Sequence, residues 1–419
     1  MLKRSDFPAT RKDLINDVIA GVTVAIVALP LAIGFGITAG MSAAAGISTA
    51  IIAGLIAGLL GGSRYQVSGP TGAMTVVLIP VIAKFGVSAI PILGLMAGLI
   101  VIAMSIVRLG GLINKVPDSV VEGFTVGIAI VIGLQQLPLA LSVKKGEGDR
   151  TLQVAINTIK SAFEIGLHWQ SISVVAITLI IKFNFVKIIE FLKLRSYIPA
   201  SFGALVATTL IVKIFGFNVN SIGNIPRNVS TWTAPTVSNL DLQKLIIPAL
   251  SIALLAAIES LLSARVADDL TNTKEADKFS PNKELFGQGV ATTVASVFGG
   301  MPATGAIART NVNVRAGAKS RLSAMVHALT LLLIVLFFAP IFSQIPSAAI
   351  AGVLIGTSFR IFNKASMLEI FKSGKKNIFI YLVTAVTTVS VDLIWGIFVG
   401  IALYLILRAI PKKSSSDNN

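Results

Sequence analysis

The residues best placed to do chemistry lie in a polar stretch, 66–75, that interrupts hydrophobic sequence with glycines and a proline. An echo of this stretch occurs 233 positions later, where Ala303-Thr304-Gly305-Ala306 repeats Pro70-Thr71-Gly72-Ala73. Matched helix-breaking patches in the two halves of a membrane protein are typical of a transport site. The alternative is that each patch only kinks a packed helix.

A half-helix that starts at each patch would present an electropositive end to the membrane interior. The first turn of a helix leaves about four N–H groups unpaired, and this end carries roughly half a positive charge. The two half-helices would begin near Thr71 and Thr304, and in inverted repeats their ends meet near the midplane. We therefore predict a site for a small anion between these ends.

Arg309 lies about five residues into the second half-helix. A charged residue at membrane depth is costly and usually marks a pathway or a paired site. Arg309 could raise the positive potential behind the anion, which is the interpretation we favour. The alternative is that its side chain reaches toward an aqueous surface.

Glu259 is the clearest acidic residue in a hydrophobic span, and Ser263 follows it at i+4 on the same helical face. A carboxylate with a nearby hydroxyl can coordinate Na⁺, or the carboxyl group can take up a proton. This predicts coupling of transport to Na⁺ or H⁺ through these two residues. The alternative is a buried ion pair between Glu259 and Arg309.

Other kinds of chemistry have little support in the sequence. There is no Walker A motif and no Ser/His/Asp constellation, so we expect neither ATP hydrolysis nor another enzyme activity. The chain has no cysteine, and its two histidines, His168 and His327, are far apart. We expect no cofactor and no zinc or redox metal, with Na⁺ as the candidate coupling ion.

The composition is that of a polytopic membrane protein. Of 419 residues, 54% are hydrophobic and 13% are charged, against about 25% charged in soluble proteins. The net charge is +16, but the basic residues lie mainly in loops and at span ends, which indicates membrane orientation rather than nucleic-acid binding. We expect the bilayer and a small anion as partners, a homodimer as a candidate assembly, and no nucleic acid.

Hydropathy predicts an all-α fold of 14 spans, with half-helices as spans 3 and 10. In the first half the spans are expected at 17–39, 43–62, 71–85, 88–107, 120–141, 172–189 and 199–217. In the second half they are expected at 245–267, 285–299, 303–314, 322–342, 347–362, 378–390 and 393–410. Residues 151–169 are partly amphipathic and ambiguous.

A second repeated motif supports two halves. Pro117-x5-Gly123-x3-Gly127 recurs as Pro346-x5-Gly352-x3-Gly356, at an offset of 229. Because each half has seven spans, the second half must enter from the opposite face, which makes the repeats inverted. The predicted divisions are a first repeat at 1–217, an inter-repeat loop at 218–244, a second repeat at 245–410 and a disordered tail at 411–419.

The basic residues also predict orientation. In this threading 26 Lys and Arg lie on the side of the termini and eight lie opposite, which favours cytoplasmic termini in the plasma membrane, the inner membrane of a bacterium.

The motifs together resemble those of the sulfate permease (SulP) family of anion transporters. The resemblance rests on Gly61-Gly62-Ser63-Arg64-x3-Ser68-Gly69-Pro70-Thr71 in the first half. Its counterparts in the second half are Asn282–Gly289 (NKELFGQG), Gly299–Thr310 and Asn313-Val314-Arg315-Ala316-Gly317. The resemblance covers essentially the whole chain.

This resemblance implies the seven-plus-seven inverted fold that the family shares with uracil permeases. Spans 1–4 and 8–11 would form a moving core, and spans 5–7 and 12–14 a gate. The cation-coupling position of bicarbonate-transporting members maps onto Glu259, with Ser263 at the companion hydroxyl position. With the half-helix argument, the predicted anion site comprises Thr71, Gly72, Ala73, Ala303, Thr304, Gly305 and Arg309.

Two departures from the family pattern bear on function. Most members carry a cytoplasmic STAS domain after the last span, whereas this sequence stops at Asn419, so either the member is short or the sequence is trimmed. The Tyr-Gly-Leu-Tyr character of eukaryotic members is absent around 43–49, which favours a bacterial-type branch.

The predicted function is secondary active transport of a small anion by alternating access, coupled to Na⁺ or H⁺. Bicarbonate is favoured slightly over sulfate or a dicarboxylate. The nearest rival is a nucleobase:proton symporter of the same fold, which we would expect to carry acidic groups in both core halves. An anion channel or a non-transporting scaffold would belong to a different class.

Overall fold

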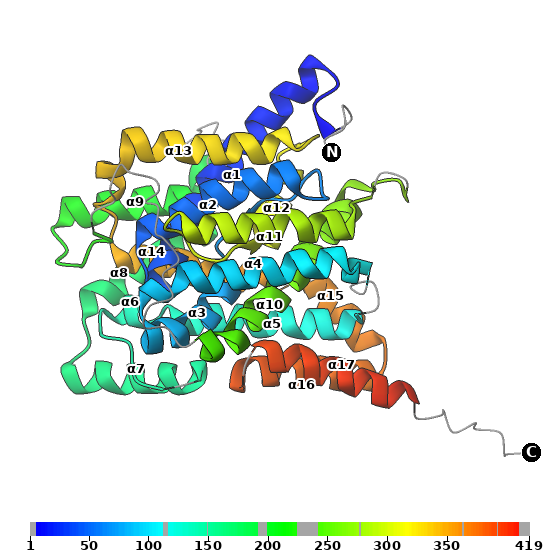
Figure 1. Ribbon diagram of the computed structural model, residues 1–419. Helices are drawn as coiled ribbons and strands as arrows, with labels where there is room; N and C mark the ends of the chain where they lie inside the picture. Colours follow the sequence, from blue (N-terminus) through cyan, green and yellow to red (C-terminus); the bar gives the residue numbers. More distant parts are fainter. Residues whose placement is uncertain are drawn as a thin grey trace, which may run out of the picture.

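Helices make up most of the protein, and many of them run roughly parallel to one another (Figure 1). The computed structural model describes residues 6–111, 116–148, 150–191, 199–223, 242–275, 278–362, 364–391 and 393–409. The predicted disordered tail and most of the predicted inter-repeat loop, residues 224–241, lie outside the described residues.

The helices of the first half follow the predicted spans closely. They are α1 (Arg11–Thr38), α2 (Ala43–Leu60), α3 (Gly72–Phe85), α4 (Ile90–Ile106), α5 (Asp118–Gln135), α6 (Leu137–Leu141), α7 (Thr151–Ile165), α8 (Trp169–Phe191) and α9 (Ala200–Phe215), with a 3₁₀ turn, η2 (Val87–Ala89), before α4.

The helices of the second half do the same, except near the second polar patch. They are α10 (Leu242–Thr271), α11 (Pro281–Val297), α12 (Ile307–Arg315), α13 (Leu322–Phe342), α14 (Ser347–Ile361), α15 (Lys364–Lys372), α16 (Lys375–Ser390) and α17 (Leu393–Ala409). Two short strands, β1 (Ser68–Gly69) and β2 (Thr304–Gly305), lie just before α3 and α12.

Local sequence explains where several helices begin. Thr10 and Asp13 form a capping box, so α1 starts at Arg11, earlier than hydropathy alone indicated. Pro117, Pro199 and Pro346 each occupy the N-cap of α5, α9 or α14. Proline has no N–H and a fixed φ, and a helix start tolerates both restrictions.

Three features differ from or refine the sequence expectations. The ambiguous residues 151–169 contain the short amphipathic helix α7. The predicted fifth span is divided into α5 and α6 at Gln136, two residues before Pro138. An additional helix, α15, with its own mix of polar and apolar residues, precedes α16.

Length and hydropathy identify membrane-crossing candidates. Among the described residues, seven helices are long and apolar enough to cross a bilayer: α1, α2, η2 with α4, α5 with α6, α8, α10 and α13. Shorter apolar helices are α3, α9 and most of α17. The protein is therefore a multi-pass membrane protein, and the count of 14 crossings stays a prediction.

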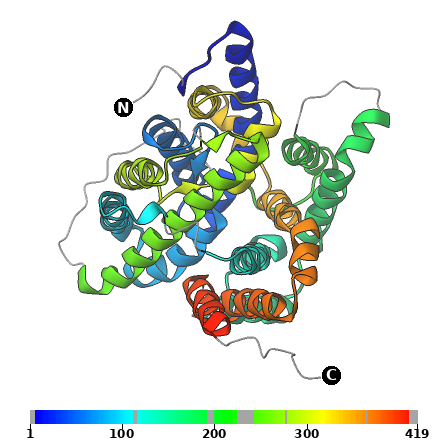
Figure 2. The ribbon, with the colours of Figure 1, turned by 90° about the vertical axis from the view of Figure 1, so that its right-hand side faces the viewer.

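The helices associate in an order that differs from the chain order. α4 packs most extensively on α11, and α1 and α2 both pack on α13. Elsewhere α5 packs on α16, while α8 packs on α9 and α14. The view in Figure 2 runs along many of the helices and shows α1, in blue, beside α13, in yellow, although these helices are far apart in the sequence.

The Gly-x3-Gly motif of α5 permits a close helix contact. A Cβ added at Gly123 would lie 2.5 Å from the carbonyl oxygen of Tyr381, and one at Gly127 would lie 2.5 Å from Cβ of Thr388. Both neighbours belong to α16. Small residues allow such close approach of helix backbones in membranes.

The second copy of the motif, on α14, makes the same kind of contact with α8. A Cβ at Gly352 would lie 2.8 Å from Cβ of Thr178, and one at Gly356 would lie 2.9 Å from Cδ of Lys182. The two copies of the motif therefore serve the same packing role in the two halves.

We expect Gly127→Ala to destabilise the protein, because the new methyl group would overlap the β-carbon of Thr388. Overpacking of this kind typically costs about 1–3 kcal/mol. The measurement is the midpoint of thermal unfolding of the purified protein in detergent.

The matched control is Gly54→Ala on α2, where the added carbon would meet its nearest neighbour at an ordinary 3.4 Å. This control should melt at or above the wild-type temperature, because alanine favours a helix. If Gly127→Ala melts as high as Gly54→Ala, the close α5–α16 contact is wrong.

Candidate functional site

The two polar patches predicted to form a site meet in the structure. Strands β1 and β2 pair antiparallel, with Ser68 opposite Gly305 and Gly69 opposite Thr304. Backbone groups that leave a helix inside a membrane must find partners within the protein. The pairing of β1 with β2 supplies some of these partners. Backbone groups of each patch are therefore hydrogen-bonded in part by backbone groups of the other patch.

Thr71 starts α3 as predicted. Its backbone is extended, and its hydroxyl accepts a hydrogen bond from the N–H of Met74 at 3.4 Å. The N–H groups of Gly72 and Ala73 have no acceptor among the described residues. The first turn of α3 therefore offers two free donors at its electropositive end.

The prediction that the second half-helix begins at Ala303–Thr304 is wrong. Thr304 and Gly305 form β2, and α12 begins only at Ile307, after the N-cap Ala306. The cause is the pairing with β1, which holds these residues extended. The Gly305 N–H donates to Oγ of Ser260 at 2.9 Å, so this donor is already used.

Glu259 lies beside the place where the two polar patches meet, which we call the crossing. Its carboxylate accepts a hydrogen bond from the Thr71 hydroxyl at 3.0 Å. The Glu259 side chain is 9% exposed. The acidic residue predicted to couple transport thus contacts the threonine of the first patch.

Ser263 lies one turn further along α10 and contacts α12. Its hydroxyl forms a hydrogen bond with that of Thr310 at 2.9 Å, and Thr310 also accepts from the N–H of Val67 at 3.2 Å. The hydroxyl that touches the second patch from α10 belongs instead to Ser260, 3.1 Å from Oγ1 of Thr304.

Arg309 is enclosed by protein, so the alternative in which it reaches an aqueous surface is wrong. Its side chain is 1% exposed, and one guanidinium nitrogen, Nη2, donates to the carbonyl oxygen of Pro70. Another, Nη1, lies where a Cβ at Gly69 would be, which explains that glycine. Within the described chain, Arg309 forms no ion pair with Glu259.

The carbonyl group of Ala303 faces α11 rather than a ligand. It accepts from Nε2 of Gln288 at 2.8 Å and from the hydroxyl of Thr292 at 2.9 Å. The side-chain oxygen of Gln288 accepts from the Ser68 hydroxyl at 2.8 Å. Gln288 therefore bridges the two patches.

Sequence reasoning missed this supporting row on α11. Glu284, Gln288 and Thr292 recur at intervals of four, so they share one helical face. Glu284 accepts from the N–H groups of Gly62 and Ser63 at 2.7 and 2.8 Å, and from Nε2 of Gln66 at 2.6 Å. The polar period within an apolar span was the signal that could have revealed it.

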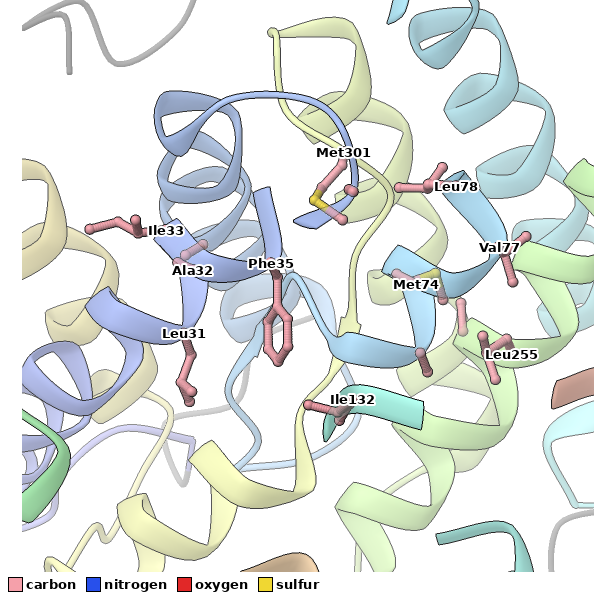
Figure 3. Close-up of a cluster of buried hydrophobic side chains, with 14 of the residues drawn as sticks. Leu31, Ala32, Ile33, Phe35, Met74, Val77, Leu78, Ile132, Leu255 and Met301 are labelled. Carbon is pink, nitrogen blue, oxygen red and sulfur yellow. The ribbon is translucent and has the colours of Figure 1, made fainter. Parts of the chain in front are cut away.

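Apolar side chains surround the start of α3. Figure 3 shows Phe35 of α1 and Ile132 of α5 on one side of this turn, with Met74 and Leu255 nearby. Phe35 is 7% exposed and Ile132 is 5% exposed. Such walls exclude water and strengthen electrostatic interactions at the first turn of the helix.

The available oxygen atoms suit a hard monovalent cation better than a transition metal. The described residues hold no group of three or more His, Cys, Asp or Glu that could bind a metal ion. The carboxylate of Glu259 and the hydroxyls of Thr71 and Thr304 are oxygen donors, which hard cations prefer.

Comparison with known proteins places these features in a family context. A family model described as the sulfate permease family matches residues 14–384. A protein of Bacillus subtilis (strain 168) named "Putative sulfate transporter YvdB" is 35% identical over 349 residues, which is 82% of this chain and 64% of that protein. The bicarbonate transporter BicA of Synechocystis is 33% identical over 361 residues, 83% of this chain and 61% of that protein.

Solved structures agree on the fold. The transmembrane domain of a cyanobacterial bicarbonate transporter BicA superposes with a TM-score of 0.82 at 30% identity, covering 93% of this chain and 98% of that one. SLC26A9 gives a TM-score of 0.79 at 17% identity, over 95% of this chain and 66% of that one, and shows the fold alone. The chain spans less than two thirds of the length of the curated relatives named above.

We expect Gln288→Ala to weaken the crossing, because it removes one hydrogen bond to each patch. A buried polar group left without its partner costs about 1–3 kcal/mol, here the Ser68 hydroxyl. The measurement is again the thermal midpoint in detergent, compared with that of Gln344→Ala, an exposed glutamine. Equal midpoints for the two variants would contradict the bridging role.

Proposed function

The chain belongs to the sulfate permease family, and from this premise we propose that it is a secondary transporter for a small inorganic or carboxylate anion. The observation that carries the proposal is the hydrogen bond between Thr71 and Glu259. It joins the electropositive start of α3 to a buried carboxylate that is suited to coupling.

The anion would bind at the first turn of α3. The free N–H groups of Gly72 and Ala73 point out of a helix N-terminus, which favours negative charge. Thr71 and Thr304 add hydroxyl groups from the two patches. Arg309 adds positive charge from behind β1, and its hydrogen bond to Pro70 keeps it there.

Glu259 gives this site a physical basis for coupling. Two like charges ~6 Å apart repel by about 3 kcal/mol at an effective dielectric constant of ~20. A charged Glu259 beside the site would therefore weaken anion binding, and a bound Na⁺ or proton would remove the penalty. The two ligands then favour each other's binding reciprocally.

The groups proposed to hold Na⁺ are Glu259 and nearby hydroxyls. Ser263 was the predicted companion, and its hydroxyl lies against Thr310. Thr71 contacts the carboxylate itself, so it is the better placed oxygen donor.

Among anions, we propose bicarbonate ahead of sulfate and dicarboxylates. Relatives named as bicarbonate transporters and as sulfate transporters occur at similar identity, so their names support anion transport without choosing between these substrates. The preference rests on the acidic residue with hydroxyl partners on α10, the pattern associated with cation-coupled bicarbonate transport.

The proposed movement is that of a core against a gate. The core would contain α1–α4 and α10–α13, and the gate would contain α5–α9 and α14–α17. The extensive packing of α4 on α11 and of α1 on α13 supports the first group, and that of α5 on α16 and of α8 on α14 supports the second. Rigid-body displacement of the core would then expose the site to each side in turn.

We also propose cytoplasmic termini, from the distribution of basic residues, and a homodimer as the assembly.

An uptake assay tests the function directly. Purified protein in liposomes should accumulate at least one of radiolabelled bicarbonate, sulfate or fumarate above protein-free liposomes, with a rate that saturates. Radiolabelled uracil serves as the comparison for the nucleobase alternative. If none of the three anions accumulates, or if only uracil does, the anion-transporter proposal is wrong.

The variant Glu259→Gln tests the coupling role. It removes the charge that the cation would neutralise, so we expect the stimulation of anion uptake by an inward Na⁺ or H⁺ gradient to disappear. The matched control is Glu190→Gln, an exposed glutamate on α8, which should keep that stimulation. Unchanged dependence on both gradients in Glu259→Gln would exclude Glu259 from the mechanism.

A further inference from the structure

We propose that Ile132 and Gln135 on α5, with Gln136 at its C-cap, form a latch that closes the anion site on the face opposite the chain termini. This inference deepens the proposed function, on which it rests, by naming the residues that must separate for the site to open on that face. We call these three residues the α5 latch.

The spacing of the latch residues places them together. Positions 132, 135 and 136 are related as i, i+3 and i+4, so they share one face of a helix. Each contacts an element of the proposed core. Ile132 meets Gly72 and Gln135 meets Thr75, both on α3, while Gln136 meets Thr38 at the end of α1.

Ile132 packs against Gly72, whose N–H group is one of the donors that would bind the anion. A Cβ added at Gly72 would lie 2.3 Å from Cγ1 of Ile132 and 3.3 Å from Cε1 of Phe35. The isoleucine side chain therefore packs directly against the backbone of the first turn of α3 (Figure 3). An anion approaching from this face would have to displace it.

The two glutamines of the α5 latch form neutral hydrogen bonds with the proposed core. The Thr75 hydroxyl shares its hydrogen between the carbonyl oxygen of Gly72 and Oε1 of Gln135, the latter at 2.9 Å, and the Thr38 hydroxyl donates to Oε1 of Gln136 at 3.4 Å. Gln136 is completely buried, and its amide nitrogen donates to the carbonyl oxygen of Ile132 at 3.2 Å. This last hydrogen bond joins Gln136, which contacts α1, to Ile132, which packs against Gly72.

The latch is suited to repeated opening. Neutral hydrogen bonds contribute little net free energy, because their groups can pair with water after separation. An ion pair in this position would cost more free energy, because both charges would lose their water each time the latch closes. The contact between the proposed core and gate at the other end of α5 is of another kind: Arg265 and Asp118 are 3.9 Å apart with side chains 39% and 79% exposed.

Cross-linking tests the latch in a chain that has no cysteine of its own. The pair Thr75→Cys and Gln135→Cys would be joined with a short bifunctional methanethiosulfonate reagent, and the cross-link verified by mass spectrometry. The control pair is Thr178→Cys and Thr208→Cys, whose native hydroxyls are 3.2 Å apart between α8 and α9, inside the proposed gate.

We expect the cross-linked latch pair to lose anion uptake and to regain it on reduction, while the cross-linked control pair keeps transporting. Uptake by the cross-linked latch pair at the rate of its reduced form would overturn the proposal, because the two helices would then not need to separate.

A second measurement does not depend on transport. A single cysteine at the site, Thr71→Cys, is labelled in intact cells with a membrane-impermeant thiol reagent. Adding Gln135→Ala should speed this labelling about fivefold, the population change expected for the loss of one ordinary hydrogen bond. Adding Gln344→Ala, an exposed glutamine outside the latch, should leave the rate unchanged.

The two measurements separate the possible failures. If wild-type protein carries no tested anion but Gln135→Ala speeds labelling, the proposed substrate is wrong and the latch stands. If wild-type protein transports but Gln135→Ala and Gln344→Ala label at the same rate, the latch is wrong and the transporter stands.

Discussion

The structure depends on one constraint: backbone groups inside a membrane must be paired within the protein. The two polar patches each interrupt a helix, and each interruption leaves N–H and C=O groups without helical partners. The short ladder between β1 and β2 pairs some of them. Side chains of α10 and α11 pair others, as when Ser260 accepts from Gly305 and Gln288 donates to Ala303. Among the described residues, the N–H groups of Gly72 and Ala73 stay unpaired, and these donors are the ones proposed to bind the anion.

The two charged residues near the crossing, Arg309 and Glu259, are also held by hydrogen bonds to the first patch. Arg309 is buried behind β1 and donates to the carbonyl oxygen of Pro70, where it fixes that strand. Glu259 approaches from α10 and is hydrogen-bonded to the Thr71 hydroxyl. The two charges sit at one crossing without neutralising each other. A positive arginine behind the strand and a carboxylate at its front make anion binding sensitive to whatever binds Glu259.

The sequence predicted the class of protein and most helix positions well, because hydropathy and prolines act locally. It located α13 at 322–342, the bounds observed, and it identified Thr71 as the start of α3. It failed at Thr304, where pairing with a strand far away in the chain overrides the local tendency to form a helix. It also missed Ser260, Gln288 and Glu284, because their partners lie on other elements and no local pattern states which polar group meets which.

By itself, therefore, the sequence determined that the chain crosses a membrane many times, that two similar patches interrupt it, and that Glu259 and Arg309 are its unusual charges. These properties are set by composition and by spacing along the chain. Only the tertiary structure decided that the carboxylate of Glu259 touches the first patch, that Arg309 faces Pro70 rather than Glu259, and that α5 covers Gly72. Those facts are set by the pairing of segments more than a hundred residues apart, or by the docking of one helix on another, because packing and hydrogen-bond satisfaction are properties of the assembled chain.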